Sequence, residues 1–197
     1  PASGEILVDG ESIERKRNYC GYMPQQDLLF PWRTVRENLL LPMEIRGGYS
    51  KTEMREKADA ALESVGLKDW GDKTPKELSG GMRQRAAFAR TVLTGSDLLL
   101  LDEPFSALDY QTRLSVCDDI SAILRSAGKT ALLITHDLAE AISIADRILI
   151  LTARPGTIKA SLSIHFSPEA DTPLKRRNAP EFAGYFNDVW GNLQTEH

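Results

Sequence analysis

Two short motifs combine residue types that could bind and act on a phosphate group. Ser79-Gly80-Gly81 stands where a helix is expected to begin, so a hydroxyl and accessible backbone N–H groups would meet an anion at the positive end of the helix dipole. Asp102 and Glu103 directly follow a run of leucines, which predicts a buried strand ending at the carboxyl edge of an α/β sheet. One carboxylate there could serve Mg²⁺ and the other an attacking water. Together the motifs predict a site for a nucleotide phosphate.

The elements that must position these motifs alternate between strand and helix. Apolar runs predict strands at residues 5–9, 19–23, 98–101, 131–134 and 147–151. Capping boxes that begin at Thr34 and Ser50 predict two helices, and Gly66 would end the second. Three further helices are expected. One would begin near Ser79, a second would end at Gly128, and a third would begin at Asp137. This alternation predicts an α/β fold with a parallel sheet covered by helices.

The last thirty residues predict a linker followed by a helix. Residues 168–180 are polar and interrupted by prolines, and Lys175-Arg176-Arg177 within them would be solvated. Residues 181–193 predict a terminal helix. Its aromatic side chains, Phe182, Phe186 and Trp190, are expected to dock on the domain rather than bind a cofactor.

Composition excludes several classes of protein. The 197 residues carry a net charge of -4, and the pI near 5.5 lacks the basic footprint of a nucleic-acid binder. No apolar stretch approaches the roughly 20 residues that a membrane helix needs. Cys20 and Cys117 form no C-x-x-C pair, which argues against a cysteine metal site and fits a reducing cytosol. We therefore expect one soluble domain whose membrane contacts, if any, go through a partner.

Three more motifs lie elsewhere in the sequence. They are Gln25 in Tyr22-Met23-Pro24-Gln25-Gln26-Asp27, Asp109 in Ser106-Ala107-Leu108-Asp109, and His136 in Ile134-Thr135-His136-Asp137. With the signature Leu78-Ser79-Gly80-Gly81 and the pair Asp102-Glu103, they make the chain resemble the nucleotide-binding subunit of ATP-binding cassette (ABC) transporters over essentially its whole length. The motifs around Gln25, Asp109 and His136 match the Q-loop, D-loop and H-loop of that family.

The resemblance implies a fold and its divisions. The fold is the P-loop NTPase type, a parallel sheet flanked by helices with a helical subdomain. Residues 1–33 would form part of the ATPase core through the Q-loop, 34–77 the helical subdomain, 78–165 the signature and the rest of the core, and 166–197 a linker and C-terminal helix.

The resemblance also implies roles for named residues, with ATP and Mg²⁺ as cofactors. Glu103 would orient or deprotonate the attacking water, and His136 would contact the γ-phosphate. Gln25 would touch both Mg²⁺ and the water, and Asp102 would hold Mg²⁺, mostly through water. Ser79, Gly80, Gly81 and Asp109 would act on the ATP of a second subunit in a head-to-tail dimer.

The implied partners are a second copy of the subunit, transmembrane permease subunits and, indirectly, a solute-binding protein, with no nucleic acid. The subunit would lie peripherally on the cytoplasmic face of the cell membrane. Pro31-Trp32-Arg33-Thr34-Val35 and Ala153-Arg154-Pro155-Gly156 are similar to the branch that imports nitrate, sulfonates, taurine or thiamine-precursor pyrimidines. ATP hydrolysis would thus power uptake of a small anionic or heterocyclic solute.

The family's Walker A loop, Gly-x-x-x-x-Gly-Lys-Ser/Thr, has no match here. Gly128-Lys129-Thr130 is the nearest, but Ile123 stands where the first glycine should be, and the triplet follows a helix. We therefore expect the chain to be a fragment that is inactive and marginally stable by itself. The alternatives are a soluble ABC-type ATPase not coupled to transport and a catalytically dead binding module.

One further segment has two interpretations, and a pair of arginines has a purely structural one. The apolar segment Leu28–Trp32 could fill the core or dock a transmembrane partner. Arg83 and Arg90, two turns apart on the signature helix, are adequately explained as a solvated, ion-paired face.

Overall fold

A three-stranded parallel sheet forms the centre of the computed structural model, which describes residues 3–8, 10–16 and 19–194. Its strands are β3 (Cys20–Met23), β4 (Leu98–Asp102) and β5 (Thr130–Ile134), in the order β3-β4-β5. Met23 aligns with Leu101, and Asp102 with Ile134. The carboxyl ends of all three strands therefore meet at one edge, as the sequence predicts.

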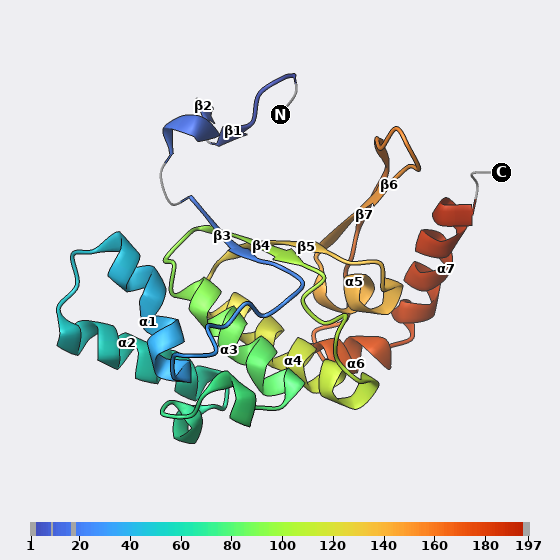
Figure 1. Ribbon diagram of the computed structural model, residues 1–197. Helices are drawn as coiled ribbons and strands as arrows, with labels where there is room; N and C mark the ends of the chain where they lie inside the picture. The colour runs from blue at the N-terminus through green and yellow to red at the C-terminus, as the bar shows by residue number, and fades with distance from the viewer. Residues whose placement is uncertain (1–2, 9, 17–18, 195–197) are drawn as a thin grey trace.

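Helices cover one face of this sheet (Figure 1). Directly beneath the sheet lie α3 (Gly80–Val92) and α4 (Tyr110–Ser126). Beside them, α1 (Val35–Arg46) and α2 (Lys51–Ser64) pack against α3, with short 3₁₀ turns at Lys68–Trp70 and Pro75–Glu77. The core between helices and sheet includes Met23, Leu99, Leu101, Phe88 and Val116. The α/β fold with a helical subdomain is confirmed.

The opposite face of the sheet is open. Leu99 and Leu101 are buried against the helices, whereas Leu98 and Leu100 are only half-buried, so the prediction of a buried strand is wrong for one of its faces. Because strand side chains alternate between faces, the same face also carries Leu132 and Ile134, which are 48% and 52% exposed. An apolar surface therefore lies directly beside the sheet's carboxyl edge.

The helical subdomain begins as its capping residues predict. The Thr34 hydroxyl accepts a hydrogen bond from the Glu37 backbone N–H, and the Glu37 carboxylate accepts one from the Thr34 N–H. Ser50 and Glu53 repeat this exchange at the start of α2. Two orphan donors are satisfied at each helix start, which fixes where α1 and α2 begin.

A second, smaller core joins the C-terminal elements. It packs the antiparallel hairpin of β6 (Arg147–Leu151) and β7 (Ile158–Ser163) against α5 (Leu138–Ile144) and α7 (Glu181–Gln194). Within the predicted linker lies a short helix, α6 (Pro173–Arg177), capped by the Thr172 hydroxyl. The prediction of a linker without regular structure is therefore wrong for these residues, because a threonine followed by proline favours the start of a helix.

Two further predictions for this C-terminal part need correction. Arg176 is not simply solvated, since its guanidinium donates to the backbone oxygens at the end of α5 and lies over the Phe166 ring. On α7, Val189 is buried in the second core and Phe182 packs against it, whereas Phe186 and Trp190 are 37% and 48% exposed. Only part of the aromatic face of α7 docks.

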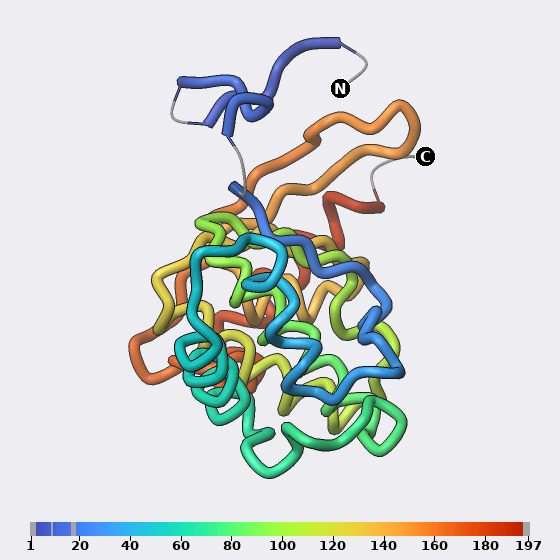
Figure 2. Tube along the Cα trace, turned by 60° about the vertical axis from the view of Figure 1, so that its left-hand side comes forward, coloured from blue at the N-terminus to red at the C-terminus, as the bar shows by residue number. Residues whose placement is uncertain are grey.

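The N-terminal residues form a separate small unit. β1 (Leu7–Val8) and β2 (Glu11–Ser12) pair antiparallel and lead into a 3₁₀ turn at Ile13–Arg15. Figure 2 shows this unit standing apart from the body of the chain. The strand expected at residues 5–9 is thus shorter in the structure, and Asp9 lies outside the described residues.

None of the helices in the described ranges is both long and apolar enough to cross a bilayer.

The open face leads to a stability prediction for the isolated chain. Leu132→Lys should reduce self-association and apolar-dye binding, because it places a charge on an exposed apolar surface beside an unpaired strand edge. Light scattering and dye fluorescence measure both effects, and unfolding in urea should change by less than about 0.5 kcal/mol. The matched change Leu99→Ala, on the covered face, should cost about 2–5 kcal/mol. Undiminished association of Leu132→Lys would contradict this prediction.

Candidate functional site

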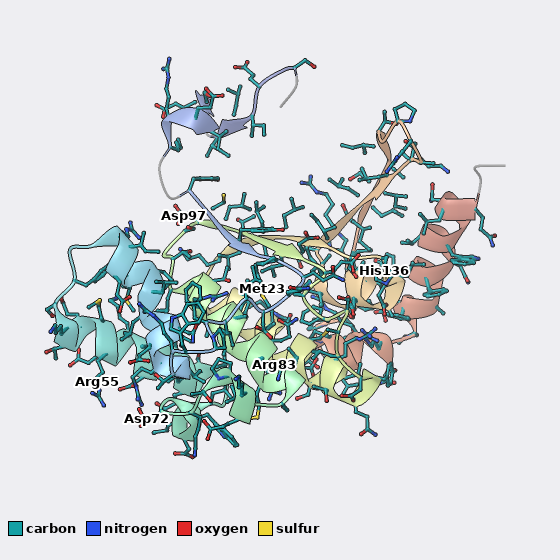
Figure 3. The ribbon with its side chains drawn as sticks, in the orientation of Figure 1. Met23, Arg55, Asp72, Arg83, Asp97 and His136 are labelled. Atoms are coloured by element: carbon teal, nitrogen blue, oxygen red, sulfur yellow. The ribbon has the colours of Figure 1, made fainter. Side chains whose placement is uncertain are left out.

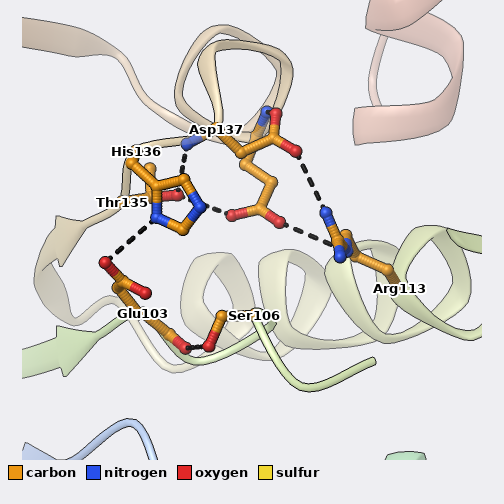
Figure 4. A pocket seen from close by; sticks show the side chains of 7 residues that line it. Glu103, Ser106, Arg113, Thr135, His136 and Asp137 are labelled. Atoms are coloured by element: carbon orange, nitrogen blue, oxygen red, sulfur yellow. Dashed lines mark hydrogen bonds and ion pairs between the residues drawn. The ribbon is translucent and has the colours of Figure 1, made fainter. Parts of the chain in front are cut away.

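Glu103 stands at the centre of a polar cluster at the carboxyl edge of the sheet. Its Oε1 lies 3.0 Å from Nδ1 of His136, and its Oε2 accepts a hydrogen bond of 3.2 Å from Nε2 of Gln25. Gln25 Nε2 also lies 3.1 Å from the Ser106 hydroxyl. Figure 3 labels Asp97 and His136 near opposite edges of the sheet, and Figure 4 shows the Glu103–His136 contact. Gln25 and His136 therefore share the carboxylate of Glu103, and all three were predicted to be catalytic.

The backbone of Glu103 adopts a conformation that is rare for a residue with a side chain. Its φ is 43°, in the left-handed region. The Glu103 N–H donates to the Ile134 oxygen at 2.8 Å, and the Glu103 oxygen accepts from the Ser106 hydroxyl at 3.1 Å. Such strain costs on the order of 1–3 kcal/mol and persists where the surroundings hold it. The strained turn directs the carboxylate toward the ends of the neighbouring strands.

Asp102 has a different partner. Its Oδ2 accepts a hydrogen bond of 3.0 Å from the Tyr22 hydroxyl on the neighbouring strand. This bond raises the pKa of the Tyr22 phenol above its ordinary value. Within the described ranges, no cluster of three or more His, Cys, Asp or Glu could hold a metal by itself. Carboxylate and amide oxygens from Asp102 and Gln25 fit Mg²⁺, which keeps several waters and takes few protein ligands.

A charged network supports the loop that carries His136 (Figure 4). Arg113 of α4 donates to the Asp137 carboxylate at 3.1 Å and to the Leu108 oxygen at 3.0 Å. Glu140 is almost fully buried behind it, 3.6 Å from the Arg113 guanidinium, and accepts a hydrogen bond from the Thr135 hydroxyl. Burial raises the pKa of the Glu140 carboxyl, because desolvation disfavours its charged form. Arg113 thus connects the D-loop with the H-loop.

The signature residues have distinct environments at the start of α3. Ser79 is exposed and caps the helix by accepting from the Met82 N–H at 3.3 Å. A Cβ at Gly80 would meet nothing closer than 3.7 Å, whereas one at Gly81 would lie 2.4 Å from the Thr112 side chain. A Cβ would therefore be accommodated at Gly80, whereas Gly81 is needed for close packing of α3 on α4.

Asp109 likewise caps a helix. Its carboxylate accepts from the Thr112 N–H at 3.1 Å, and this interaction with Thr112 lowers the pKa of Asp109. Among the described contacts, none joins Ser79 or Asp109 to Glu103. The structure therefore brings Gln25, Glu103 and His136 together, with Asp102 beside them, and leaves the signature and Asp109 outside this cluster.

Several contributing residues escaped the sequence analysis. The sequence assigns no role to Tyr22, Arg113 or Glu140, because each contacts a partner distant in sequence, which for Glu140 is Arg113. Arg90 was interpreted as part of a solvated face, and this is wrong, since its guanidinium donates to the backbone oxygens of Asp27 and Leu28.

Comparison with known proteins identifies similar sequences. The family profile described as ABC transporter matches residues 1–106. The chain is 44% identical over 195 residues to the uncharacterized ABC transporter ATP-binding protein YtlC of Bacillus subtilis (strain 168), covering 99% of this chain and 75% of YtlC. It is 38% identical to the nitrate import ATP-binding protein NrtD of Synechocystis, covering 96% and 72%. It is 39% identical to the aliphatic sulfonates import ATP-binding protein SsuB of Bacillus licheniformis, covering 98% and 72%.

A solved structure is similar in fold. It is the dimeric post-hydrolysis state of the ATP-binding cassette MJ0796 bound to ADP and Pi, with a TM-score of 0.69 and 28% identity. The match covers 85% of this chain and 76% of that one.

The raised pKa of Glu140 predicts a pH-dependent stability difference. A carboxyl whose folded pKa exceeds its unfolded value contributes stability below the unfolded pKa, near 4.3, and loses it as pH rises through the folded pKa. Glu140→Gln should therefore gain stability relative to the unaltered chain as pH rises from about 4 to about 8. Urea unfolding across this range measures the difference. A constant difference would contradict the prediction, and Glu169→Gln, at an exposed carboxyl, serves as the control.

Proposed function

Because this chain belongs to the ABC transporter family of ATP-binding proteins, we propose that it binds and hydrolyses ATP to power uptake of a small anionic or heterocyclic solute. The observation that carries this proposal is the Glu103 carboxylate held between Gln25 and His136. A carboxylate oriented on both oxygens is suited to position a water and accept its proton.

Each residue at the sheet edge has a proposed task. Glu103 orients the attacking water and takes up its proton at a carboxylate oxygen. Gln25 fixes that carboxylate through its amide and offers its own oxygen to the ion and the water. His136 contacts the terminal phosphate, and Asp102 holds the ion. Bound Mg²⁺ would neutralise charge on the phosphate oxygens.

The signature and Asp109 are proposed to serve a second copy of the subunit. Ser79 and Asp109 are exposed and lie outside the Glu103 cluster, so their polar groups remain available to a partner. A similar cassette is described as dimeric and bound to ADP and Pi, which supports this arrangement. ATP would then be enclosed between the carboxylates of one copy and the signature of the other.

A permease is proposed to dock on the segment Leu28–Trp32. Leu29 is buried in the core, as the core-filling interpretation predicts, whereas Trp32 is 75% exposed and stacks on Phe30. The exposed Trp32 ring, with Leu28 of the same segment, offers an apolar contact surface next to the Q-loop. The subunit would lie peripherally on the membrane through this contact, with a solute-binding protein acting on the far side of the permease.

Nitrate or sulfonates are the proposed solutes. Two similar proteins are named as nitrate and aliphatic sulfonates import ATP-binding proteins. The permease and the solute-binding protein would make the choice between such solutes.

Glu103→Gln tests the proposed catalysis. In the complete gene product, including any residues encoded before Pro1, ATP turnover should fall by about 10² to 10⁴-fold because the proton acceptor is lost. ATP binding should persist, since the amide keeps the shape of the side chain. The 197 residues contain no Walker A loop, so we expect no turnover from this chain alone.

Asp97→Asn provides the matched control. It removes an exposed carboxylate just before the same strand, where Asp97 pairs with Lys129, and should leave turnover unchanged. Normal turnover by Glu103→Gln would remove Glu103 from its role. Turnover that is insensitive to the permease would instead favour a soluble ATPase.

A further inference from the structure

The arginine at the far end of the signature helix holds the backbone of the Q-loop. Arg90 Nη1 donates to the Leu28 oxygen at 2.8 Å, and Nη2 donates to the Asp27 oxygen at 2.8 Å. The guanidinium thus bridges two consecutive carbonyls with its planar fork, a geometry that lysine cannot reproduce. Arg90 is half-buried, and this burial lowers the pKa of its guanidinium because desolvation disfavours the charged form.

Two other residues of the same helix contact the same loop. Gln84, which is 3% exposed, donates from Nε2 to the Gln25 oxygen at 3.3 Å. Arg83 donates from Nε to the Asp27 carboxylate at 3.0 Å. We call Arg83, Gln84 and Arg90 the clamp. Its contacts span the loop from Gln25 to Leu28 over two turns of α3.

The held loop is strained. Leu28 has a φ of 45°, which places a residue with a branched side chain in the left-handed region. Asp27 Oδ1 accepts from the Leu29 N–H at 3.1 Å while its Oδ2 receives Arg83. Such a backbone relaxes unless its surroundings hold it. The three residues of the clamp supply four of the hydrogen bonds that maintain this conformation.

The clamp connects two functional regions on one rigid element. Ser79 caps the start of α3, and Arg90 lies near its end. In the loop that α3 holds, Gln25 donates a hydrogen bond to the Glu103 carboxylate. A continuous helix transmits displacement along its length because its backbone hydrogen bonds resist bending.

We propose that Arg90, with Arg83 and Gln84, makes the signature helix and the Q-loop move as one unit. This inference rests on the proposed function. In the proposed dimer, the signature of a subunit meets one ATP while its Gln25 and Glu103 act on the other. The clamp therefore couples the two ATP sites, so nucleotide at the signature positions the glutamine of the second site. These three are positioning residues, since they act through Gln25 and the loop.

The test uses the complete gene product reconstituted with its permease. Arg90→Met removes the fork but keeps an unbranched apolar stem, and should lower kcat by about 10 to 100-fold through misplacement of Gln25. The Hill coefficient for ATP should fall toward 1 because the sites no longer communicate. Binding of a fluorescent ATP analogue by the detergent-solubilised complex should stay within about 2-fold. Arg90→Lys should show nearly the same losses of kcat and of the Hill coefficient, since a lysine ammonium cannot bridge the two carbonyl oxygens as a planar guanidinium does.

Arg85→Met is the matched control. Arg85 lies on the same helix but pairs with Ser115 and Asp119 of α4 instead of the Q-loop. It should leave both the Hill coefficient and kcat unchanged. Amide hydrogen exchange provides a second readout: residues 26–30 should exchange faster in Arg90→Met, and in the milder Arg83→Ala, than in Arg85→Met.

The outcomes separate the two proposals. Identical kinetics and exchange for Arg90→Met and Arg85→Met would overturn the coupling while leaving the proposed function intact. An unaltered complex that neither binds nor hydrolyses ATP would overturn the proposed function and the coupling with it. If Arg90→Met does not accumulate, Arg83→Ala decides: an unchanged Hill coefficient together with unchanged exchange overturns the coupling, and a lowered value with faster exchange supports it.

Discussion

The two oxygens of the Glu103 carboxylate have partners from different strand ends. Gln25 follows β3 and His136 follows β5, while Glu103 itself follows β4 between them. This convergence requires three adjacent parallel strands in a register that ends them at the same level, which is what the pairing of Met23 with Leu101 and of Asp102 with Ile134 provides. A one-residue slip of either outer strand would turn its side chains to the opposite face.

Around this carboxylate, several features lower the stability of the fold while they hold the side chains of the site in position. The left-handed backbone of Glu103 is held by the Ile134 oxygen and the Ser106 hydroxyl. Behind the H-loop, the buried Glu140 is desolvated beside Arg113. A strained backbone and a desolvated carboxyl are each unfavourable by themselves. Here the first is at Glu103 itself and the second is behind the loop that carries His136, and both residues are proposed to act on ATP.

The helices beneath the sheet form the core and also hold the loops of the site. α3 buries Phe88 against the sheet, presents Ser79 at one end and holds the Q-loop along its length. Gly81 allows α3 to approach α4, whose Arg113 in turn joins the D-loop and H-loop. Elements that look independent along the chain therefore share contacts at the site, which is how binding at one surface could reach another.

The amino-acid sequence by itself determined the class of fold, the helix starts at Thr34, Ser50 and Asp137, and the family with its principal motifs. These features depend on local hydrogen bonds, periodicity and contiguous residues, all of which can be read along the chain. Tertiary structure alone decided which face of the sheet is covered and that β6 pairs antiparallel with β7. It also decided the contact of Tyr22 with Asp102 and the hold of Arg90 on the Q-loop. Those contacts join residues from 62 to 80 positions apart, and no local pattern encodes which distant partner a side chain will meet.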